Sequence, residues 1–361
     1  MPNQSEEIQF LRASRSDLDE VYDLHILNEG EKRNRYIWEW EYGNGNPLGS
    51  LLLIAKHRDK IIATEGMFII PLIIGEKVYY SGKDESTLVD LAYRGKGMGD
   101  LLYNFALQEF KKHGVACVWG FTRKALKLVK RAGYSSYPDA IKRAVIAFNY
   151  SNTYQLVRAS KKFNFKPFLL KTIIAIVAVY SKFVCSLHTK QKIQFNQSTS
   201  DKLLYPDDLI KLYEKVGIFS PKQLSIYPNN TFYEWRVLKS PKNKWQLFIY
   251  QNGEIAGCLI VTLHDGSAEI LDFCFINTKV GKMLLQKFIE FSKGNNISIA
   301  FYTGNHTNYI NKGIFSLLKK FGFLITNAPN TFVFKELNYT GNFDLFDITK
   351  WYINGMWSEG T

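Results

Sequence analysis

The stretch that decides the fold reads Ser86-Thr-Leu-Val-Asp-Leu-Ala-Tyr-Arg-Gly-Lys-Gly-Met-Gly-Asp-Leu-Leu102. Its apolar, strand-like beginning gives way to a turn with three glycines, and a helical pattern starts directly after Gly99. Glycines let the backbone approach a ligand closely, and the start of a helix offers unpaired N–H groups and the positive end of the helix dipole. The stretch therefore predicts a strand, a loop that cradles a pyrophosphate, and a helix.

This loop resembles motif A of the GNAT family of N-acetyltransferases, V-x-P-x-x-(R/Q)-G-x-G-x-(G/A). Val89 stands at its start, Leu91 replaces the usual proline, and the loop consists of Arg94, Gly95, Lys96, Gly97, Met98 and Gly99. The resemblance implies that the loop amides hold the pyrophosphate of acetyl-CoA or another acyl-CoA, while the strand at Leu88 and Val89 binds the pantetheine arm. A Walker A loop and a dinucleotide fold require other glycine spacings. A plain strand-to-helix corner is the alternative without a ligand.

A second stretch, from Phe121 to Tyr134, has the pattern of a basic amphipathic helix that ends in Gly-Tyr. It resembles the A-x-x-L-Y-x-x-x-G-F motif of GNAT enzymes through Ala125, Leu128, Gly133 and Tyr134. Val129 stands where many members carry the tyrosine that protonates the departing thiolate. The resemblance leaves this role to another group, and we expect Tyr134 or a water molecule to take it.

Length and composition indicate a globular protein of two domains. The chain has 361 residues, of which 46% are hydrophobic and 22% charged, and its net charge of +13 favours anionic partners such as coenzyme A, nucleotide-linked sugars, nucleic acid or a membrane surface. The four cysteines lie far apart, which predicts neither a zinc site nor a disulfide framework. The polar N-terminus differs from a secretory signal, so we expect a cytoplasmic protein.

The segments around the loop predict the remaining elements of a first domain. We expect a strand over 8–13, a helix from Leu18, strands over 51–55, 61–65 and 67–74, a helix over 101–113 and a strand over 115–120. Between the first helix and the next strand, Trp38, Trp40 and Tyr42 alternate, which would place them on one face of an extended segment. That face either covers the edge of the core or forms a wall of the acceptor site.

The second half repeats the order of the first. Strands are expected over 245–250, 255–261, 270–275 and 297–302, and helices over 280–291 and 314–323. This repeat predicts an α/β (α+β) protein of two tandem GNAT-like domains, each with a twisted, mainly antiparallel mixed sheet flanked by helices. Where the first half has its glycine loop, the second has Ile276-Asn-Thr-Lys-Val-Gly281 with one glycine. We therefore expect a degenerate second domain and one cofactor site.

These patterns divide the chain into four parts. We expect a GNAT domain over 1–150, a linker with an apolar helix at 168–187 over 151–200, a degenerate GNAT-like domain over 201–338 and a packed tail over 339–361. The uninterrupted apolar run covers only 173–180, whereas a membrane span needs about 18 residues or more. We expect no transmembrane segment; the helix packs between the domains or lies on a membrane surface.

Acyl transfer from a thioester to an amine requires a base for the amine and a donor to the carbonyl oxygen. We expect a backbone N–H near Val89 to polarise the carbonyl group. Of the carboxylates near the predicted cleft, Glu65, Asp84, Glu85 and Asp90, we choose Glu85 as the base because it lies at the entry of the strand. A salt bridge with Lys83 is its structural alternative. The six histidines show no metal-ligand spacing, so we expect no metal.

The leading hypothesis is an acyl-CoA-dependent N-acyltransferase, most simply an acetyltransferase, that transfers directly to an amine of a small molecule. Its aromatic segment is similar to that of tandem GNAT proteins of polysaccharide or amino-sugar biosynthesis, which points to an amino sugar or nucleotide-linked sugar. No nucleic-acid partner is expected. A transferase of the Fem type, which uses aminoacyl-tRNA, is an alternative that lacks this loop, and a non-catalytic GNAT-like binding protein is another.

Overall fold

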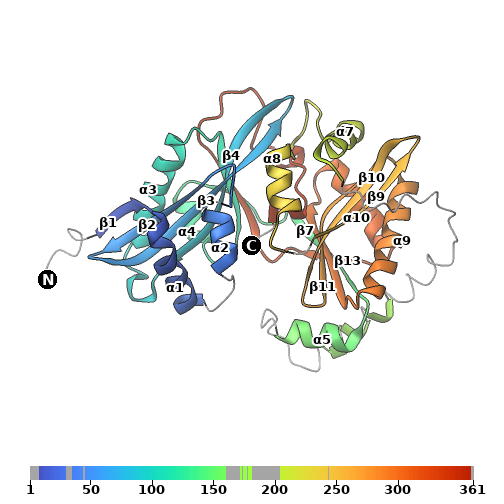
Figure 1. Ribbon diagram of the computed structural model, residues 1–361, viewed down its shortest axis with the longest axis horizontal. Coiled ribbons are helices and arrows are strands. Elements are labelled where there is room, and N and C mark those ends of the chain that lie inside the picture. Colours follow the sequence, from blue (N-terminus) through green and yellow to red (C-terminus); the bar gives the residue numbers. More distant parts are fainter. Residues whose placement is uncertain are drawn as a thin grey trace.

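The computed structural model describes residues 8–29, 35–43, 45–159, 171–172, 174–176, 178–180, 204–242 and 244–358. These residues form two mixed sheets that are flanked by helices and lie side by side along the long axis of the molecule (Figure 1). The prediction of an α/β protein with two mixed, mainly antiparallel sheets flanked by helices is confirmed. The predicted helix over 168–187 lies mostly outside the described residues.

The first sheet is built largely from the first half of the chain. Its order is β1 (Ile8–Arg12), β2 (Ser50–His57), β3 (Lys60–Ile74), β4 (Lys77–Val89), β5 (Cys117–Thr122), β14 (Thr331–Glu336) and β6 (Ser135–Tyr137), with β8 (Leu224–Ile226) beside β3. Only β4 and β5 run parallel among these pairs; the others are antiparallel.

Helices cover both faces of this sheet. On one face, Leu52 and Ile54 pack with α1 (Leu18–Glu29) and α2 (Arg35–Tyr42). On the other face, Leu51 and Leu53 pack with α3 (Met98–Lys112) and α4 (Leu126–Arg131). Neighbouring residues of a strand point to opposite faces, so this alternation follows from the continuous apolar run in β2. Short 3-10 turns, η1 (Arg15–Asp17) and η2 (Leu91–Tyr93), precede α1 and the glycine loop.

The second sheet has a similar plan. Its order is β13 (Leu324–Asn327), β7 (Ile141–Ala147), β12 (Ile299–Asn305), β11 (Ser267–Phe275), β10 (Glu254–His264) and β9 (Lys244–Gln251). The helices of this half are α7 (Pro206–Val216), α8 (Asn230–Tyr233), the π-helical turn η3 (Glu234–Leu238), α9 (Thr278–Gly294) and α10 (Tyr309–Lys320). As in the first sheet, one pair, β11 with β12, is parallel and leads into and out of a long helix, α9.

The two halves of the chain exchange strands: in addition to the short β8, which pairs with β3, one strand from each half lies in the sheet of the other. β7 precedes α5 (Tyr150–Ala159) in the first half of the chain, yet it pairs with β12 and β13 of the second sheet. β14 belongs to the second half but pairs with β5 and β6 of the first sheet. The sheets therefore assign 141–147 and 331–336 to opposite sides of the predicted domain division, and one hydrophobic core runs across both halves.

Two predicted elements differ from the structure. The predicted strands over 61–65 and 67–74 are one continuous strand, β3, because Gly66 stays in register with Leu52 of β2. The single helix predicted from Phe121 to Tyr134 is wrong. Residues 121 and 122 extend β5 and pair with Phe332 and Thr331 of β14, so that only Leu126–Arg131 remain helical in α4. A strand partner distant in sequence overrides the helical pattern here.

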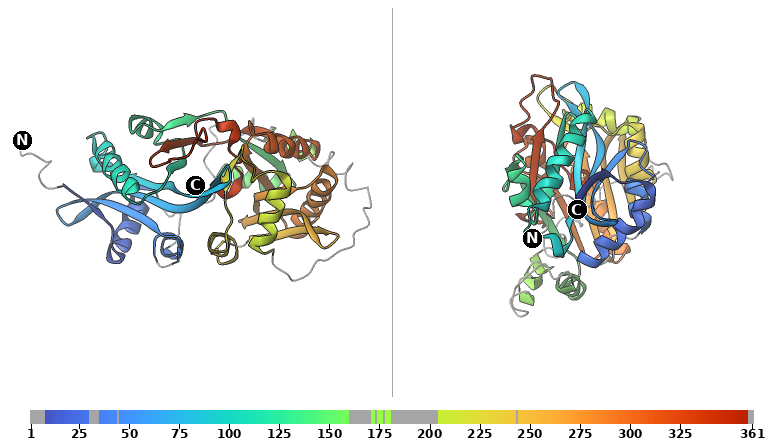
Figure 2. Two further views of the ribbon diagram at one scale, coloured as in Figure 1. Left: turned by 90° about the horizontal axis from the view of Figure 1, so that it is seen from above. Right: turned by 90° about the vertical axis from the view of Figure 1, so that its left-hand side faces the viewer.

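The segment after β14 packs between the sheets (Figure 2). It contains η4 (Ile348–Lys350) and α11 (Gly355–Ser358), and its side chains Trp351, Tyr352, Ile353 and Trp357 are buried. The Trp357 ring lies 4.5 Å from that of Trp119 on β5. From here on, the word tail means residues 345–358, which lie within the tail predicted over 339–361. Among the described residues, no helix is long and apolar enough to cross a membrane.

Candidate functional site

The glycine loop has the conformation that an anion cradle needs. Gly95 and Gly97 have φ values of +76° and +79°, and a Cβ atom at either position would meet no atom within 4 Å. Gly97 is the N-cap of α3 and supplies no side-chain cap. Within the described part of the chain, nothing accepts a hydrogen bond from the N–H groups of residues 95 to 99. Five consecutive amides at the positive end of a 15-residue helix are therefore available to an anion.

Side chains of the loop divide between charge and packing. Arg94 is exposed, and its Nε donates to the carbonyl oxygen of Val89 at 2.7 Å. Lys96 is exposed and lies 5.6 Å from the centre of the Tyr93 ring. Met98 is buried, so only its backbone faces the loop. Gly99 allows α4 to approach α3, because a Cβ atom there would lie 3.0 Å from the Leu128 side chain.

The strand before the loop separates from its parallel neighbour. β4 pairs with β5 only at Gly82 with Val118 and at Lys83 with Trp119. Beyond these pairs β5 continues along β14 while β4 continues along β3, and we call the place where they part the β4–β5 split. On β4, Asp84, Ser86, Thr87 and Val89 are partly exposed, whereas Leu88 is buried against α1. Of the two strand residues predicted to bind pantetheine, Val89 thus presents its side chain and Leu88 only its backbone.

A β-bulge marks the inner end of the split. Thr64 of β3 faces Leu88, and Gly66 faces Glu85, so β4 holds one residue more than β3 over this stretch. Ser86 within the bulge has a φ of +66°, which is unusual for a residue other than glycine. Bulges redirect backbone and side-chain groups and often lie beside functional sites. The Thr64 hydroxyl donates to the Ser86 carbonyl oxygen at 2.9 Å and holds the bulge in place.

A cluster of acids and tyrosines lies at the bulge on the α3 face. Tyr134 donates its hydroxyl to Asp84 Oδ2 at 2.7 Å, and Tyr103 donates to Asp84 Oδ1 at 3.4 Å. Glu65 is fully buried beside them; the Thr87 hydroxyl and the Gly66 N–H lie near it, but no hydrogen bond of good geometry reaches its carboxyl oxygens. Burial and the neighbouring Asp84 charge raise the pKa of Glu65 well above its usual range. Burial next to the same charge also raises the pKa of Tyr134.

The predicted base lies on the opposite face of the sheet. Glu85 Oε2 is 2.8 Å from Lys83 Nζ, and both side chains are buried. Burial lowers the pKa of Lys83, and the Glu85 charge opposes this effect in part. From the second half, the Arg236 guanidinium lies within 5.1 Å of the ring centres of Trp40 and Trp235. Glu85 and Tyr134 are therefore not in contact; they lie on the two sides of the sheet at the split.

The prediction that Trp38, Trp40 and Tyr42 share one extended face is wrong, because these residues form the helix α2. A helix turns about 100° per residue, so Trp38 and Tyr42 stack at 5.3 Å while Trp40 faces the second half and contacts Trp235. Both tryptophans are buried. The Tyr42 hydroxyl donates to Ser86 Oγ at 2.9 Å across Gly66, where a side chain would collide with it. Of the three, Tyr42 reaches the bulge.

Sequence reasoning named Glu65 and Asp84 as nearby carboxylates but missed that they form a pair. The available signal was the charge of Glu65 in the middle of an otherwise apolar strand. Asp90 has a local role, since its side chain accepts from Ala92 N and caps η2.

The corresponding place in the second half, where β11 and β12 separate and α9 begins, is covered. Asn277 caps α9 by accepting from Val280 N at 3.1 Å. β11 and β12 part after Ile270 and Tyr302, and there the carbonyl oxygen of Ile353 in the tail accepts from Asn305 N and Asn311 Nδ2. Leu271 to Cys274 of β11 are all buried. The tail thus fills the place where β11 and β12 part.

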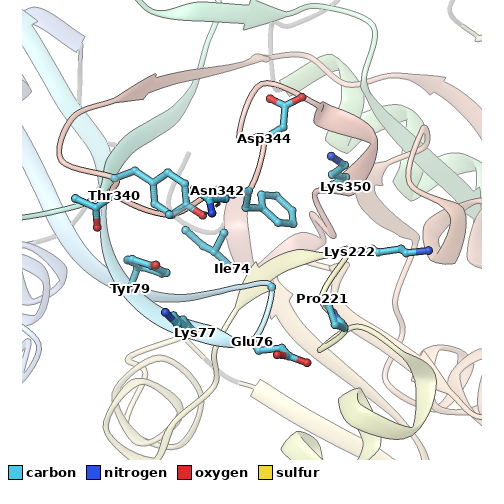
Figure 3. Close-up of a pocket in the computed structure, with 14 residues that line it drawn as sticks. Ile74, Glu76, Lys77, Tyr79, Pro221, Lys222, Thr340, Asn342, Asp344 and Lys350 are labelled. Carbon is cyan, nitrogen blue, oxygen red and sulfur yellow. Dashed lines mark hydrogen bonds between the residues drawn. The ribbon is translucent and has the colours of Figure 1, made fainter.

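A groove of about 620 Å³ lies elsewhere, between the β3–β4 turn and the loop before η4 (Figure 3). It is lined by both aromatic and charged residues, including Lys77, Tyr79, Lys222 and Lys350. None of the predicted site residues lines it. In the part of the chain that the structure describes, no three His, Cys, Asp or Glu side chains are grouped as a metal site requires.

Comparisons with known proteins agree with this geometry. The family model described as Acetyltransferase (GNAT) family matches residues 13–134, which include the loop and both ends of the split. A comparison with curated protein sequences found no match.

Solved structures with a similar fold cover both halves. A probable N-acyltransferase from Enterococcus faecalis has a TM-score of 0.62 at 10% identity, covering 92% of this chain and 73% of its own. A tandem GNAT protein from the clavulanic acid biosynthesis pathway has a TM-score of 0.56 at 11% identity, covering 93% of this chain and 100% of its own. Saccharomyces cerevisiae N-myristoyltransferase with bound myristoyl-CoA has a TM-score of 0.59 at 12% identity, covering 95% and 81%. Residues 13–134, in the half that carries the open loop, thus match the GNAT family, and both halves together have a fold similar to that of a tandem GNAT protein.

Proposed function

We propose that the chain is an acyl-CoA-dependent N-acyltransferase with one active site, at the β4–β5 split. The observation that carries this proposal is the set of five available amides at residues 95 to 99, which open the helix α3 directly beside the split. A pyrophosphate at these amides would satisfy backbone groups that otherwise need water. Arg94 and Lys96 add positive charge at the rim.

In this proposal the acyl-CoA extends from the loop along Val89 to the bulge. The partly exposed edge of β4 from Asp84 to Val89 supports this course, because its backbone has no pairing partner on β5. The thioester then lies at the bulge, and the donor to its carbonyl oxygen comes from the bulge residues rather than from Val89. Positioning of this kind supplies much of the rate increase in acyl transfer.

The two predicted catalytic residues, Glu85 and Tyr134, lie on opposite faces of the sheet, which fits direct transfer of the acyl group from a thiol on one face to an amine on the other. Asp84 and Glu85 are consecutive on β4, so their side chains point to opposite faces. The amine approaches on the face of Glu85, which takes its proton, and the thiolate departs on the face of Tyr134. Tyr42 lies on the acceptor side at the bulge and is the aromatic residue placed to contact the acceptor.

For the donor we propose acetyl-CoA, and for the acceptor a small amine such as an amino sugar or a nucleotide-linked amino sugar. The net charge of +13 is compatible with a phosphorylated acceptor as well as with coenzyme A. A non-catalytic acyl-CoA-binding protein is the outcome to be distinguished from this one.

Release of coenzyme A thiol from acetyl-CoA, measured against a panel of amino sugars, amino acids and polyamines, tests the proposal. We expect turnover with at least one amine, and its loss in Gly97→Glu, whose carboxylate would occupy the cradle. Gly253→Glu is the matched control, because Gly253 has a φ of +81° and equally open surroundings in the β9–β10 turn. Binding without turnover would favour the non-catalytic protein, and no binding would refute the proposed function.

A further inference from the structure

Two carboxyl groups meet at the inner end of the split. Glu65 on β3 lies against Asp84 on β4 next to the bulge, where Gly66 and Met67 face Glu85 and Asp84. Gly120 of β5 approaches the same place, since a Cβ atom there would lie 2.9 Å from the Asp84 carbonyl oxygen. The pair therefore lies where the three central strands meet and β4 leaves β5.

The hydrogen bonds of the pair are distributed unequally. Asp84 accepts from Tyr134 and Tyr103, whereas no hydrogen bond of good geometry reaches the fully buried Glu65, and the nearby Thr87 hydroxyl and Gly66 N–H stabilise its charged form only in part. A buried carboxylate without well-placed donors is strongly disfavoured. One proton on Glu65, directed at Asp84, removes this problem for both groups. Asp84 is then the ionised member and Glu65 the neutral one.

The pair also differs in access. Asp84 is partly exposed at the split, whereas Glu65 lies behind it with no exposed surface. A proton held on Glu65 can therefore reach a group in the split only through Asp84. Two coupled acids of unequal environment, one of them protonated at neutral pH, form the arrangement expected of a general acid.

We propose that Asp84 and Glu65 act as one general acid that protonates the departing coenzyme A thiolate. This inference rests on the proposed function and names the acid that Val129 does not provide. As the amine nitrogen bonds to the acyl carbon and the C–S bond breaks, the proton of Glu65 moves to the Asp84 carboxylate, and Asp84 passes a proton on to the departing sulfur. The amine proton goes to Glu85 on the other face. Before the next turnover, Glu85 loses this proton to water and Glu65 gains one from water. Asp84 is the catalytic residue, and Glu65 and Tyr134 are positioning residues.

The surrounding ionisable groups agree with this assignment. Tyr103 from α3, Tyr134 after α4 and Glu85 on the same strand are the ionisable groups that act on the pair among the described residues. Burial beside Asp84 raises the pKa of both tyrosines well above 10, so each keeps its proton and serves as a fixed donor to Asp84. Burial raises the pKa of both Glu65 and Asp84, and the two hydrogen bonds that Tyr134 and Tyr103 donate to Asp84 favour its ionised form, which leaves the proton on Glu65.

The pH dependence of kcat with a single acceptor tests the proposal. Glu65 must be protonated, so kcat of the wild type falls as the pH rises through the raised pKa of Glu65. In Glu65→Gln we expect kcat to fall by about 10²-fold and this high-pH decline to disappear, since an amide carries no labile proton. The affinity for acetyl-CoA should stay unchanged in isothermal titration.

Asp272→Asn is the matched control, because Asp272 on β11 also accepts from two tyrosines but lies in the closed half. It should retain the wild-type shape of the pH profile even where it lowers stability. A Glu65→Gln enzyme with wild-type kcat and pH profile would overturn the proposal.

An infrared measurement separates this inference from the proposed function. At pH 7 the difference spectrum of the wild type minus Glu65→Gln should show the C=O band of a protonated carboxylic acid. Absence of that band from the difference spectrum would overturn the shared proton whether or not any amine is acylated. Presence of the band without turnover would instead refute the proposed function.

Discussion

Both halves of the molecule contain a strand, a loop and a helix at the place where two parallel strands separate. In the first half this place is open, and in the second half it is covered. In the first half, a strand ends in a glycine loop, the N-cap Gly97 of α3 has no capping side chain, and β4 exposes part of its edge where it leaves β5. In the second half, Asn277 caps α9, and the tail covers β11 where it leaves β12. The two halves therefore differ by two local changes, a cap and a covering segment, and in the proposed function these changes decide which half can bind a cofactor.

One aspartate in each half shows the same contrast. Asp84 and Asp272 each accept hydrogen bonds from two tyrosines. Asp272 has a third donor, Asn354 of the tail at 2.8 Å, and is completely buried. Asp84 instead has Glu65 beside it and remains partly exposed. Asp272 thus binds the tail in the second half, whereas Asp84 faces the split in the first half.

Removing the tail's anchor should give the largest effect on stability. Trp357→Ala leaves a cavity against Trp119 and Trp351, and we expect the free energy of unfolding to fall by about 3–5 kcal/mol. Denaturant titration measures it. Trp245→Ala, at a side chain that is 48% exposed, should cost much less. Equal losses would show that the tail does not brace the two sheets.

The pH dependence of stability should reveal the raised pKa of Asp272. Burial raises the pKa of Asp272 to about 6 in the folded state from 3.8, so its contribution is complete below pH 4 and is lost as the pH rises through 6. Two pKa units correspond to about 3 kcal/mol. The stability lost on Asp272→Asn should therefore be larger at pH 4 than at pH 7, measured by urea unfolding. A pH-independent difference would contradict the raised pKa.

The cap of α9 should have the smallest effect. Asn277→Ala removes the acceptor of the Val280 N–H, which costs about 1 kcal/mol of stability. Acyl-CoA binding should stay unchanged, because the tail still fills the place where β11 and β12 part. A gain of a second binding site in this variant would show that the cap alone closes that half.

The loop, the strand before it and the helix after it could be predicted from sequence because glycine spacing and apolar periodicity are local signals. The duplication was visible for the same reason. The exchange of β7 and β14 could not be predicted, since it depends on pairing between residues far apart in the chain, 156 positions for Val145 with Phe301 and 211 positions for Phe121 with Phe332.

The site was predicted only in part. The cradle follows from residues adjacent in sequence, whereas the Glu65–Asp84 pair depends on the register of β3 and β4 and on a bulge. The aromatic segment was misread because Trp38, Trp40 and Tyr42 fit both a strand and a short helix, and packing against Trp235 decides between them.

The stoichiometry of acyl-CoA binding tests the central claim most directly. Isothermal titration of the intact protein with a non-hydrolysable acetyl-CoA analogue should give one site per chain. Gly97→Glu should weaken binding by about 100-fold or more, because strain and the lost charge-assisted hydrogen bonds together exceed about 3 kcal/mol. Gly253→Glu should bind as the wild type does. Two sites per chain, or one site that Gly97→Glu leaves intact, would contradict a single cradle at the loop of the first half.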